Sequence, residues 1–231
     1  MTKVLGIAGY ARCGKDTFVG IAKEILTKNG YHPVRVAFAD SLKQEVTEML
    51  KVNNFKTSVY TEEIEEKKLI RPLLVWWGCQ RRYESPDGLH WVNVAEKKIR
   101  YYIEDIKIDP EKIIFLVSDV RFLNESRWIH NSFNGEVIHL KRFSIKECRA
   151  GQDGSDVGFS KIYDPGPNDE ELKNDPLVQE VADHRIEWES KKKMTSAEAI
   201  ADVNLQKVVL ETLNSTKYFR HPSPIIGKLS Q

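Results

Sequence analysis

The chain has 231 residues, of which 41% are hydrophobic and 30% are charged, and its formal net charge is +1. This length is enough for one sizeable hydrophobic core, so one domain is the default expectation. So balanced a charge excludes a global electrostatic attraction to nucleic acid or to a membrane surface.

The cysteines and the apolar runs indicate where the protein works. Cys13, Cys79 and Cys148 show neither metal-ligand spacing nor a disulfide framework, which is typical of a reducing cytoplasm. No apolar run approaches the ~20 residues that a membrane span needs. The chain starts directly in a predicted core strand, which leaves no room for a signal peptide. We therefore expect a cytoplasmic protein without a membrane partner.

The first predicted strand, residues 4–8, runs into a Gly-x-x-x-x-Gly-Lys motif that spans residues 9–15, and a helical pattern follows. Strand, loop and helix in this order are the context of a phosphate-binding P-loop. Gly9 and Gly14 let backbone N–H groups turn inward around an anion. The helix N-terminus adds partial positive charge, and Lys15 reaches the β and γ phosphates. The motif predicts binding of a nucleoside triphosphate, with Arg12 among its contacts; a tight structural turn is the alternative.

The residue after the lysine departs from the usual motif. Asp16 stands where Ser or Thr normally offers a hydroxyl to Mg²⁺, and Thr17 follows one position late. Asp16 could hold Mg²⁺ through water or accept a proton from an attacking hydroxyl, while Thr17 can reach a phosphate oxygen. The alternative is a first-turn aspartate that the helix dipole favours.

Helices and strands alternate along the rest of the chain, which predicts a three-layer α/β fold of the P-loop NTPase type with a parallel sheet. Asp40 is a candidate N-cap for the helix after the second strand. The apolar run at 113–117 is typical of a central parallel strand that is buried on both faces. The predicted elements are strand 34–38, helix 42–50, a charged helix from 61, a helical pattern from 71 to 77, helix 90–106, strand 113–117, helix 124–132, strand 136–140, strand 183–188 and helix 196–213.

Two segments lack regular patterns. Residues 143–180 are rich in glycine, proline and polar side chains, and so long a loop is usually functional or disordered. Arg142, Lys146 and Arg149 flank its start, so this segment could be a lid that closes over ATP; an ordinary solvated loop is the alternative. Residues 215–231 read as a loosely ordered basic and aromatic tail after a domain at 1–214.

A second cluster of polar residues follows the buried strand. Asp119 and Arg121 come just past its end, where open α/β sheets bind ligands. Asp119 could serve Mg²⁺ or the acceptor, and Arg121 could hold a phosphate; a helix cap and a solvated arginine are the alternative. Arg71, Arg81 and Arg82 are further candidates, because phosphoryl transfer depends on positioning and on cations.

With these motifs in place, the chain resembles the bacteriophage-type deoxynucleoside monophosphate kinases and, more distantly, the animal-type phosphomevalonate kinases, over about residues 3–190. The matching segments are Gly-x-x-x-x-Gly-Lys-Asp-Thr at 9–17, Phe38-Ala39-Asp40-Ser41-Leu42-Lys43, the helix from Arg71 to Trp77-Gly78 that leads to His90-Trp91-Val92, Val117-Ser118-Asp119-Val120-Arg121 with Asn124-Glu125, and Val137-Ile138-His139-Leu140.

The resemblance implies a P-loop kinase that uses ATP and Mg²⁺, often forms a homodimer, and works in the cytoplasm, which is the host's if a phage encodes the protein. It places Lys15 and Asp16 at the transferred phosphate, beside the nucleotide contacts Gly9, Arg12, Gly14, Thr17 and Arg142. Asp119 and Arg121 act on the acceptor. The acceptor side also includes Asp40, Lys43, Arg71, Trp77, Arg82 and Trp91.

The acceptor stays open between alternatives. The leading expectation is a kinase that moves the γ-phosphate of ATP to a deoxynucleoside monophosphate. A related phage group phosphorylates 5-hydroxymethyluracil within DNA, and the tail, with Lys217, Tyr218, Phe219 and Arg220, suits such a polymer, since aromatic side chains among cations hold single strands or flipped bases. A P-loop regulatory NTPase is a third alternative, although the sequence shows no convincing water-positioning motif.

Overall fold

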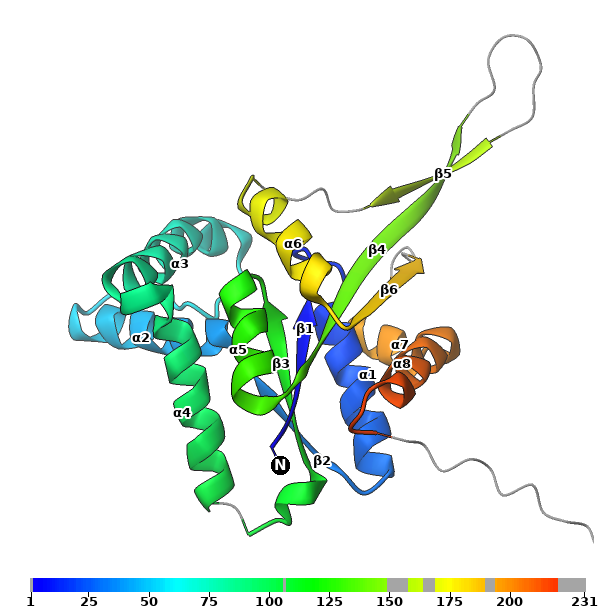
Figure 1. The fold of residues 1–231 in the computed structure, drawn as a ribbon. Coiled ribbons are helices and arrows are strands. Elements are labelled where there is room, and N and C mark those ends of the chain that lie inside the picture. The colour runs from blue at the N-terminus through cyan, green and yellow to red at the C-terminus, as the bar shows by residue number, and fades with distance from the viewer. Residues whose placement is uncertain (1, 106, 149–157, 164–168, 190–193, 220–231) are drawn as a thin grey trace, which may run out of the picture.

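The structure, a computed structural model, describes residues 2–105, 107–148, 158–163, 169–189 and 194–219. Its centre is a mostly parallel β-sheet (Figure 1). β2 (His32–Val36), β3 (Ile113–Val120), β1 (Lys3–Ala8) and β4 (Glu136–Cys148) lie side by side in this order and run parallel. β6 (His184–Glu189) also pairs parallel with β4, whereas β5 (Gly158–Tyr163) pairs antiparallel with its far end.

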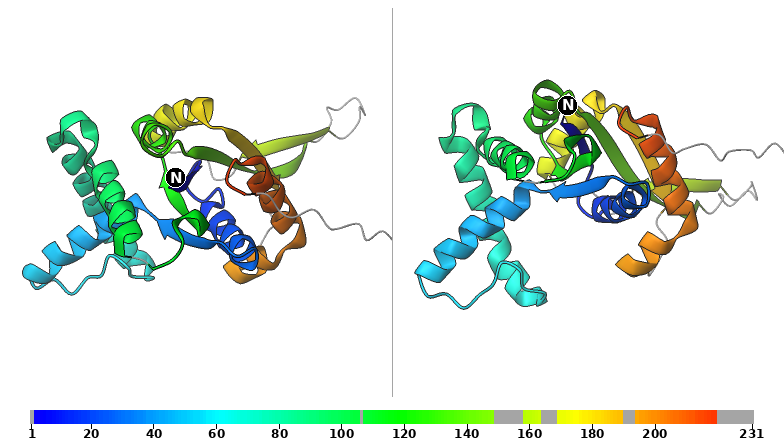
Figure 2. Two further views of the ribbon diagram at one scale, coloured as in Figure 1. Left: turned by 60° about the horizontal axis from the view of Figure 1, so that its bottom comes forward. Right: turned by 90° about the horizontal axis from the view of Figure 1, so that it is seen from below.

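Helices cover both faces of the sheet, as the alternating pattern predicts (Figures 1 and 2). α1 (Lys15–Lys28), α7 (Ser196–Ala201) and α8 (Val203–Ser215) share one core with Ile114 and Leu116 of β3. α4 (His90–Asp105) and α5 (Leu123–Phe133) share the other core with Ile113, Phe115 and Val117. The apolar run is therefore buried on both faces, and the coarse α/β prediction is confirmed.

Helices α2 (Phe38–Val52) and α3 (Ile64–Glu84) form a separate layer beside α4 (Figure 2). Val46, Leu50, Val59 and Ile70 make a small core of their own between them. At its edge the carboxylate of Glu45 accepts hydrogen bonds from Trp77, at 2.9 Å, and Arg81, at 2.8 Å, and its other oxygen lies 3.2 Å from the ring of His90. This carboxylate ties the three helices together.

The prediction that Asp40 caps a helix at residues 42–50 is wrong. α2 begins at Phe38, four residues earlier, and Asp40 lies in its first turn, where its carboxylate pairs with Arg35 at 2.6 Å. The backbone N–H groups of Phe38 and Ala39 donate instead to Asp119, which comes from β3. A cap that comes from a distant strand leaves no local sequence signal.

The irregular segment expected at 143–180 is largely regular. β4 continues to Cys148, β5 returns antiparallel, and α6 (Asp169–Val181) follows; residues 149–157 and 164–168 lie outside the described part. The hairpin of β4 and β5 extends away from the rest of the sheet (Figure 1), so it lacks the apolar run of a core strand. α6 contains Pro176 and a mostly polar sequence, which hides its helical period.

The start of the predicted tail is part of the core. Phe219 is only 1% exposed and packs against Tyr31, with ring centroids 5.7 Å apart. Tyr218 donates a 2.7 Å hydrogen bond from its hydroxyl to the carbonyl of Asn134. Loose order is therefore wrong for residues 215–219, the first of which ends α8, and residues 220–231 lie outside the described part. In the part of the chain that the structure describes, no helix is both long and apolar enough to cross a membrane.

Candidate functional site

The loop between β1 and α1, residues 9–14, has a backbone that requires its glycines. Gly9 has φ +127°, Arg12 +62° and Gly14 +98°. A Cβ on Gly9 would overlap the carbonyl oxygen of Leu140, and one on Gly14 would lie 2.5 Å from the indole of Trp188. The glycines that the motif predicts to cradle an anion are therefore also the positions where neighbouring strands leave no room for a side chain.

Lys15 is folded against this loop. Its Nζ donates hydrogen bonds to the carbonyl oxygens of Gly9, at 2.8 Å, and Tyr10, at 2.6 Å, and only 8% of the residue is exposed. Burial lowers the pKa of this ammonium, while the nearby charges of Glu171 and Asp119 favour its protonated form. The amino group of Lys15 thus lies against the loop, at the start of α1.

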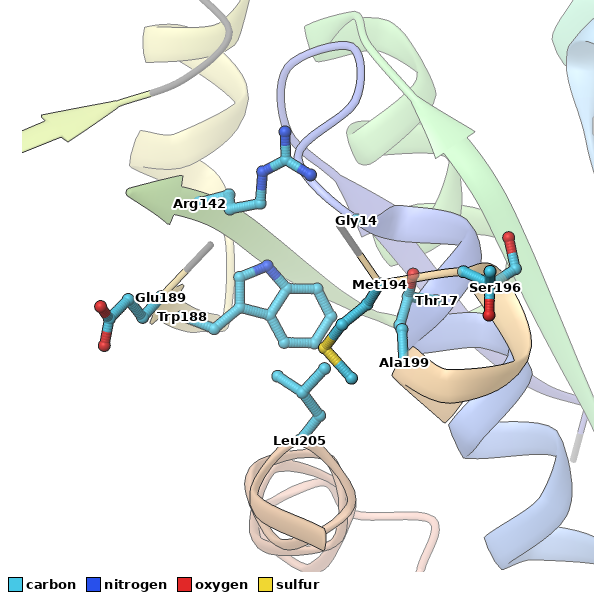
Figure 3. A pocket seen from close by; sticks show the side chains of 10 residues that line it. Gly14, Thr17, Arg142, Trp188, Glu189, Met194, Ser196, Ala199 and Leu205 are labelled. Carbon is cyan, nitrogen blue, oxygen red and sulfur yellow. The ribbon is translucent and has the colours of Figure 1, made fainter. Parts of the chain in front are cut away.

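A cavity of about 130 Å³ lies beside the loop, and we call it the Trp188 cavity (Figure 3). Figure 3 shows the indole of Trp188 between the guanidinium of Arg142 and the side chain of Leu205, and Met194 belongs to the same lining. Thr17 lies on the side of α1. The described lining is Gly14, Thr17, Arg142, Trp188, Glu189, Met194, Thr195, Ser196, Ala199 and Leu205.

Three predicted nucleotide contacts, Gly14, Thr17 and Arg142, therefore meet at this cavity. Gly9 and Lys15 lie in the adjoining loop and at the start of α1. Asp16 and Arg12 are exposed and lie outside the described lining. Within the described residues, no group of three or more His, Cys, Asp or Glu side chains could hold a metal ion; Asp16, in the first turn of α1, remains the predicted contact for Mg²⁺.

A second cavity, of about 280 Å³, lies at the end of β3, the strand beside β1 on the side away from β4, and we call it the arginine cavity. It is enclosed by α2, α3, α4, α5 and the end of β3. Five predicted acceptor residues meet in it: Arg71, Arg82, Trp91, Asp119 and Arg121. Its apolar wall includes Phe38, Leu42, Leu74, Val75 and Phe122. Three carboxylates, of Asp119, Glu125 and Glu170, also line the cavity, and Glu125 pairs with Arg82. The cavity thus combines apolar surface with three arginines and three carboxylates, which suits a ligand with a flat apolar part and a polar group that pairs with arginine.

Three predicted acceptor residues lie outside the described lining of the arginine cavity. Trp77 donates its indole N–H to Glu45, so it belongs to the group of side chains around Glu45 that connects α2, α3 and α4. Lys43 lies with its Nζ 5.4 Å from the ring centroid of Tyr60. Asp40 pairs with Arg35. Trp91 does line the cavity, but its indole N–H is bonded to the carbonyl of Gly78 at 3.1 Å, so its role there is packing.

Asp119 joins the end of β3 to the start of α2. Its two carboxylate oxygens accept the N–H groups of Phe38, at 2.9 Å, and Ala39, at 2.8 Å. Burial raises the pKa of Asp119, and these two hydrogen bonds and the charge of Arg121 oppose that rise. The carboxylate therefore positions the helix that forms one wall of the arginine cavity, in addition to facing the cavity itself.

The sequence analysis assigned no role to Glu125, which holds two of the cavity's arginines. Its side chain is 2% exposed, bonds Arg82 at 3.1 Å, and accepts the backbone N–H groups of Arg121 and Phe122. Burial raises the pKa of Glu125 to about 7, and the charge of Arg82 opposes the rise. The guanidinium of Arg82 also lies 4.1 Å from the ring centroid of Phe122. A glutamate at the third position of a helix is the capping signal that could have identified this residue.

The sequence analysis assigned no role to Glu171 either, although it connects the 9–14 loop with Arg121 of the arginine cavity. Its carboxylate accepts a 2.7 Å hydrogen bond from the backbone N–H of Ala11 and pairs with Arg121 at 3.3 Å. A small cavity of about 40 Å³ adjoins it, lined by Gly9, Arg121, Phe122, Glu170, Glu171, Asn174 and Asp175. The contact joins α6 to a loop 160 residues earlier, so no local pattern reveals it.

In the sheet order β3-β1-β4, the arginine cavity lies at the end of β3, the glycine loop follows β1, and Arg142 of β4 lines the Trp188 cavity. Both cavities thus lie near the carboxyl ends of parallel strands. This is the edge of an open α/β sheet where ligands bind. A scan of protein-family models finds none that matches the chain, and a search of curated proteins finds no match either.

Proposed function

We propose that the protein is an ATP-dependent phosphotransferase of the P-loop kinase type, which moves the γ-phosphate of ATP to a deoxynucleoside monophosphate. One observation carries the proposal: the 9–14 loop, with Lys15 at its end, follows β1, which lies in the sheet between β4, whose Arg142 lines one cavity, and β3, whose end lines a cavity with three arginines. Phosphoryl transfer needs two anionic substrates held in line and surrounded by cations, and little covalent chemistry from the protein.

The Trp188 cavity and the loop suit the donor. The backbone N–H groups of the loop and Lys15 would hold the phosphates of ATP, with Thr17 beside them. Arg142 and the indole of Trp188 lie where they would contact the remainder of the nucleotide. Mg²⁺, when bound, neutralises charge on the phosphate oxygens, and Asp16 at the first turn of α1 would hold it through water.

The arginine cavity suits the acceptor. Arg71, Arg82 and Arg121 would hold the acceptor's phosphate, and the apolar wall with Phe38 would contact its base. An oxygen of that phosphate attacks the γ-phosphorus; a new P–O bond forms while the bond between the γ-phosphorus and the β–γ bridging oxygen breaks, and ADP leaves. The guanidinium of Arg121, which lines a small cavity together with Gly9 of the loop, would stabilise the charge of the transferred group.

A second candidate acceptor is a hydroxymethylated pyrimidine within DNA. Arg71, Val75 and Cys79 line both the arginine cavity and an open groove along α3 that continues to Lys68 and Trp76. Trp76 is 56% exposed, and an exposed aromatic ring beside cations is a surface on which single-stranded nucleic acid stacks. This groove supports an acceptor longer than one nucleotide.

Incubation with labelled ATP, a panel of deoxynucleoside monophosphates and hydroxymethylated single-stranded DNA tests both acceptors. Label in a deoxynucleoside diphosphate supports the leading proposal, and label confined to DNA supports the second. The Lys15→Ala variant is the control for a contaminating kinase. Release of labelled phosphate without labelling of any acceptor would contradict both proposals and favour a regulatory NTPase.

A further inference from the structure

A carboxylate lies in the place where the loop is expected to bind phosphate. Glu171 accepts the backbone N–H of Ala11, which is in the middle of the 9–14 loop, and pairs with Arg121 from the end of β3. Its side chain is 11% exposed. A carboxylate oxygen and a phosphate oxygen use the same donors, namely backbone N–H groups and guanidinium. Glu171 therefore occupies a site whose donors would serve a bound anion.

Glu171 is not what fixes α6 to the core. The carboxylate of Asp175, one turn later, lies 3.0 Å from the ring of His139 in β4, and both side chains are more than nine-tenths buried. Val178, also in α6, is 1% exposed within the core. These two contacts hold the helix in place. Rotation of the Glu171 side chain alone would free the N–H of Ala11 while the helix stays where it is.

Lys15, which is also expected to bind phosphate, makes hydrogen bonds within the protein as well. Nζ of Lys15 donates to the carbonyls of Gly9 and Tyr10, so it too has to change partners when phosphate binds. Glu171 differs from these carbonyls because it carries a full negative charge, which a bound phosphate would face at close range. Phosphate and Glu171 cannot both accept the N–H of Ala11 and pair with Arg121 in the same way.

We propose that Glu171 is an intramolecular competitor of phosphate, a resident carboxylate that occupies the anion site of the 9–14 loop until a polyphosphate displaces it. The displacing ligand is a nucleoside triphosphate or inorganic pyrophosphate. The inference rests on one part of the proposed function, namely that the loop binds phosphate. The apparent affinity for such a ligand is reduced by the fraction of molecules in which Glu171 occupies the site. α6 thereby sets how tightly the loop binds phosphate.

Titration calorimetry with ATP and with inorganic pyrophosphate tests the proposal on the full chain. Glu171→Gln keeps the shape of the side chain but removes its charge, and Glu171→Ala shortens the side chain so that it no longer extends to Ala11 or Arg121. Both variants should lower Kd for each ligand by about tenfold. This factor corresponds to about 1.4 kcal/mol, close to the contribution of one charge-assisted hydrogen bond. Asp169→Asn is the matched control, because it removes one exposed charge from the same turn of α6. It should change Kd by less than about twofold, as expected for a screened surface charge.

Three results separate the possibilities. Tighter binding in both Glu171 variants but not in Asp169→Asn supports the competitor. If the Glu171 variants unfold at the same temperature as the unaltered chain, and the unaltered chain binds ATP, then unchanged or weaker binding in the variants contradicts the competitor role of Glu171. The proposed function would be unaffected by that result. Failure of the unaltered chain and of every variant to bind either ligand overturns the proposed function, and the competitor with it.

Discussion

The indole N–H of Trp188 donates a 2.8 Å hydrogen bond to the carbonyl oxygen of Cys13, so β6 holds the 9–14 loop from 175 residues away. The same ring fills the space where a Cβ on Gly14 would lie. Trp188 is 5% exposed and contacts Phe18 of α1, with ring centroids 6.4 Å apart. The conformation of the loop thus depends on α1, which follows it directly, and also on β6, which comes much later in the chain.

Gly14→Ala is expected to destabilise the protein more than Gly30→Ala. Both glycines have positive φ, so both substitutions carry the strain of a left-handed residue, about 1–2 kcal/mol. Only Gly14 would also clash with Trp188, since nothing lies within 4 Å of a Cβ at Gly30. Overpacking adds about 1–3 kcal/mol to the loss. Urea unfolding of both variants measures the difference, and equal losses would show that Trp188 yields without cost.

Lys15→Ala is expected to abolish phosphate transfer with the fold intact. The lysine supplies a cationic group at the loop, and two of its three hydrogen bonds end on carbonyls to which water can donate in the variant. The midpoint of thermal unfolding should stay within a few degrees of the original. Lys23→Ala, an exposed position on α1, is the control and should keep full activity. Undiminished turnover in Lys15→Ala would contradict the role of the loop.

Arg121→Ala is expected to lower the rate of transfer by about 10²–10³-fold, the usual effect of removing one group that stabilises the transition state, while the affinity for ATP changes much less. Asp119→Asn is expected to lower the rate as well, because Asp119 positions α2, which forms one wall of the arginine cavity. Asp119→Asn should also destabilise the protein by about 1–3 kcal/mol, because one N–H at the start of α2 loses its acceptor. Kinetics at saturating ATP measure the rate, and a separate titration measures ATP binding.

The matched control for these variants is Arg127→Ala, an exposed arginine on α5. It should change neither the rate nor the ATP affinity. If Arg121→Ala lost as much ATP affinity as it lost rate, Arg121 would be assigned to the binding site of the donor and not to that of the acceptor.

Glu125 makes stability depend on pH. Its pKa is raised by burial from the usual 4.5 to about 7 in the folded protein, so the folded state binds a proton more readily than the unfolded state. The stabilisation that the bound proton provides is fully present below about pH 4.5. It is lost as the pH rises to about 7, and the free energy of unfolding falls by about 3 kcal/mol over this range. Urea unfolding of the unaltered chain and of Glu125→Gln across this range should show the stability difference falling with pH; a constant difference would contradict the raised pKa.

Local patterns in the sequence predict the centre of the fold well. The run Ile113 to Val117 identifies a strand that is buried on both faces, and Gly-x-x-x-x-Gly-Lys identifies the loop between β1 and α1. The prediction fails where the signal is not local. α2 begins at Phe38 because Asp119 from β3 receives its first N–H groups, and β4 extends to Cys148 because β5 pairs with it.

The sequence by itself determined which residue types stand at the loop and that alternating elements form an α/β core, because backbone conformation and burial depend on near neighbours and on period. Only the tertiary structure decided which of the candidate cations share a cavity. Arg71, Arg82 and Arg121 meet, while Lys43 and Trp77 face other partners. The contacts of Glu171 with Ala11 and of Trp188 with Cys13 span more than a hundred residues each, and only the folded chain brings such positions within hydrogen-bond distance.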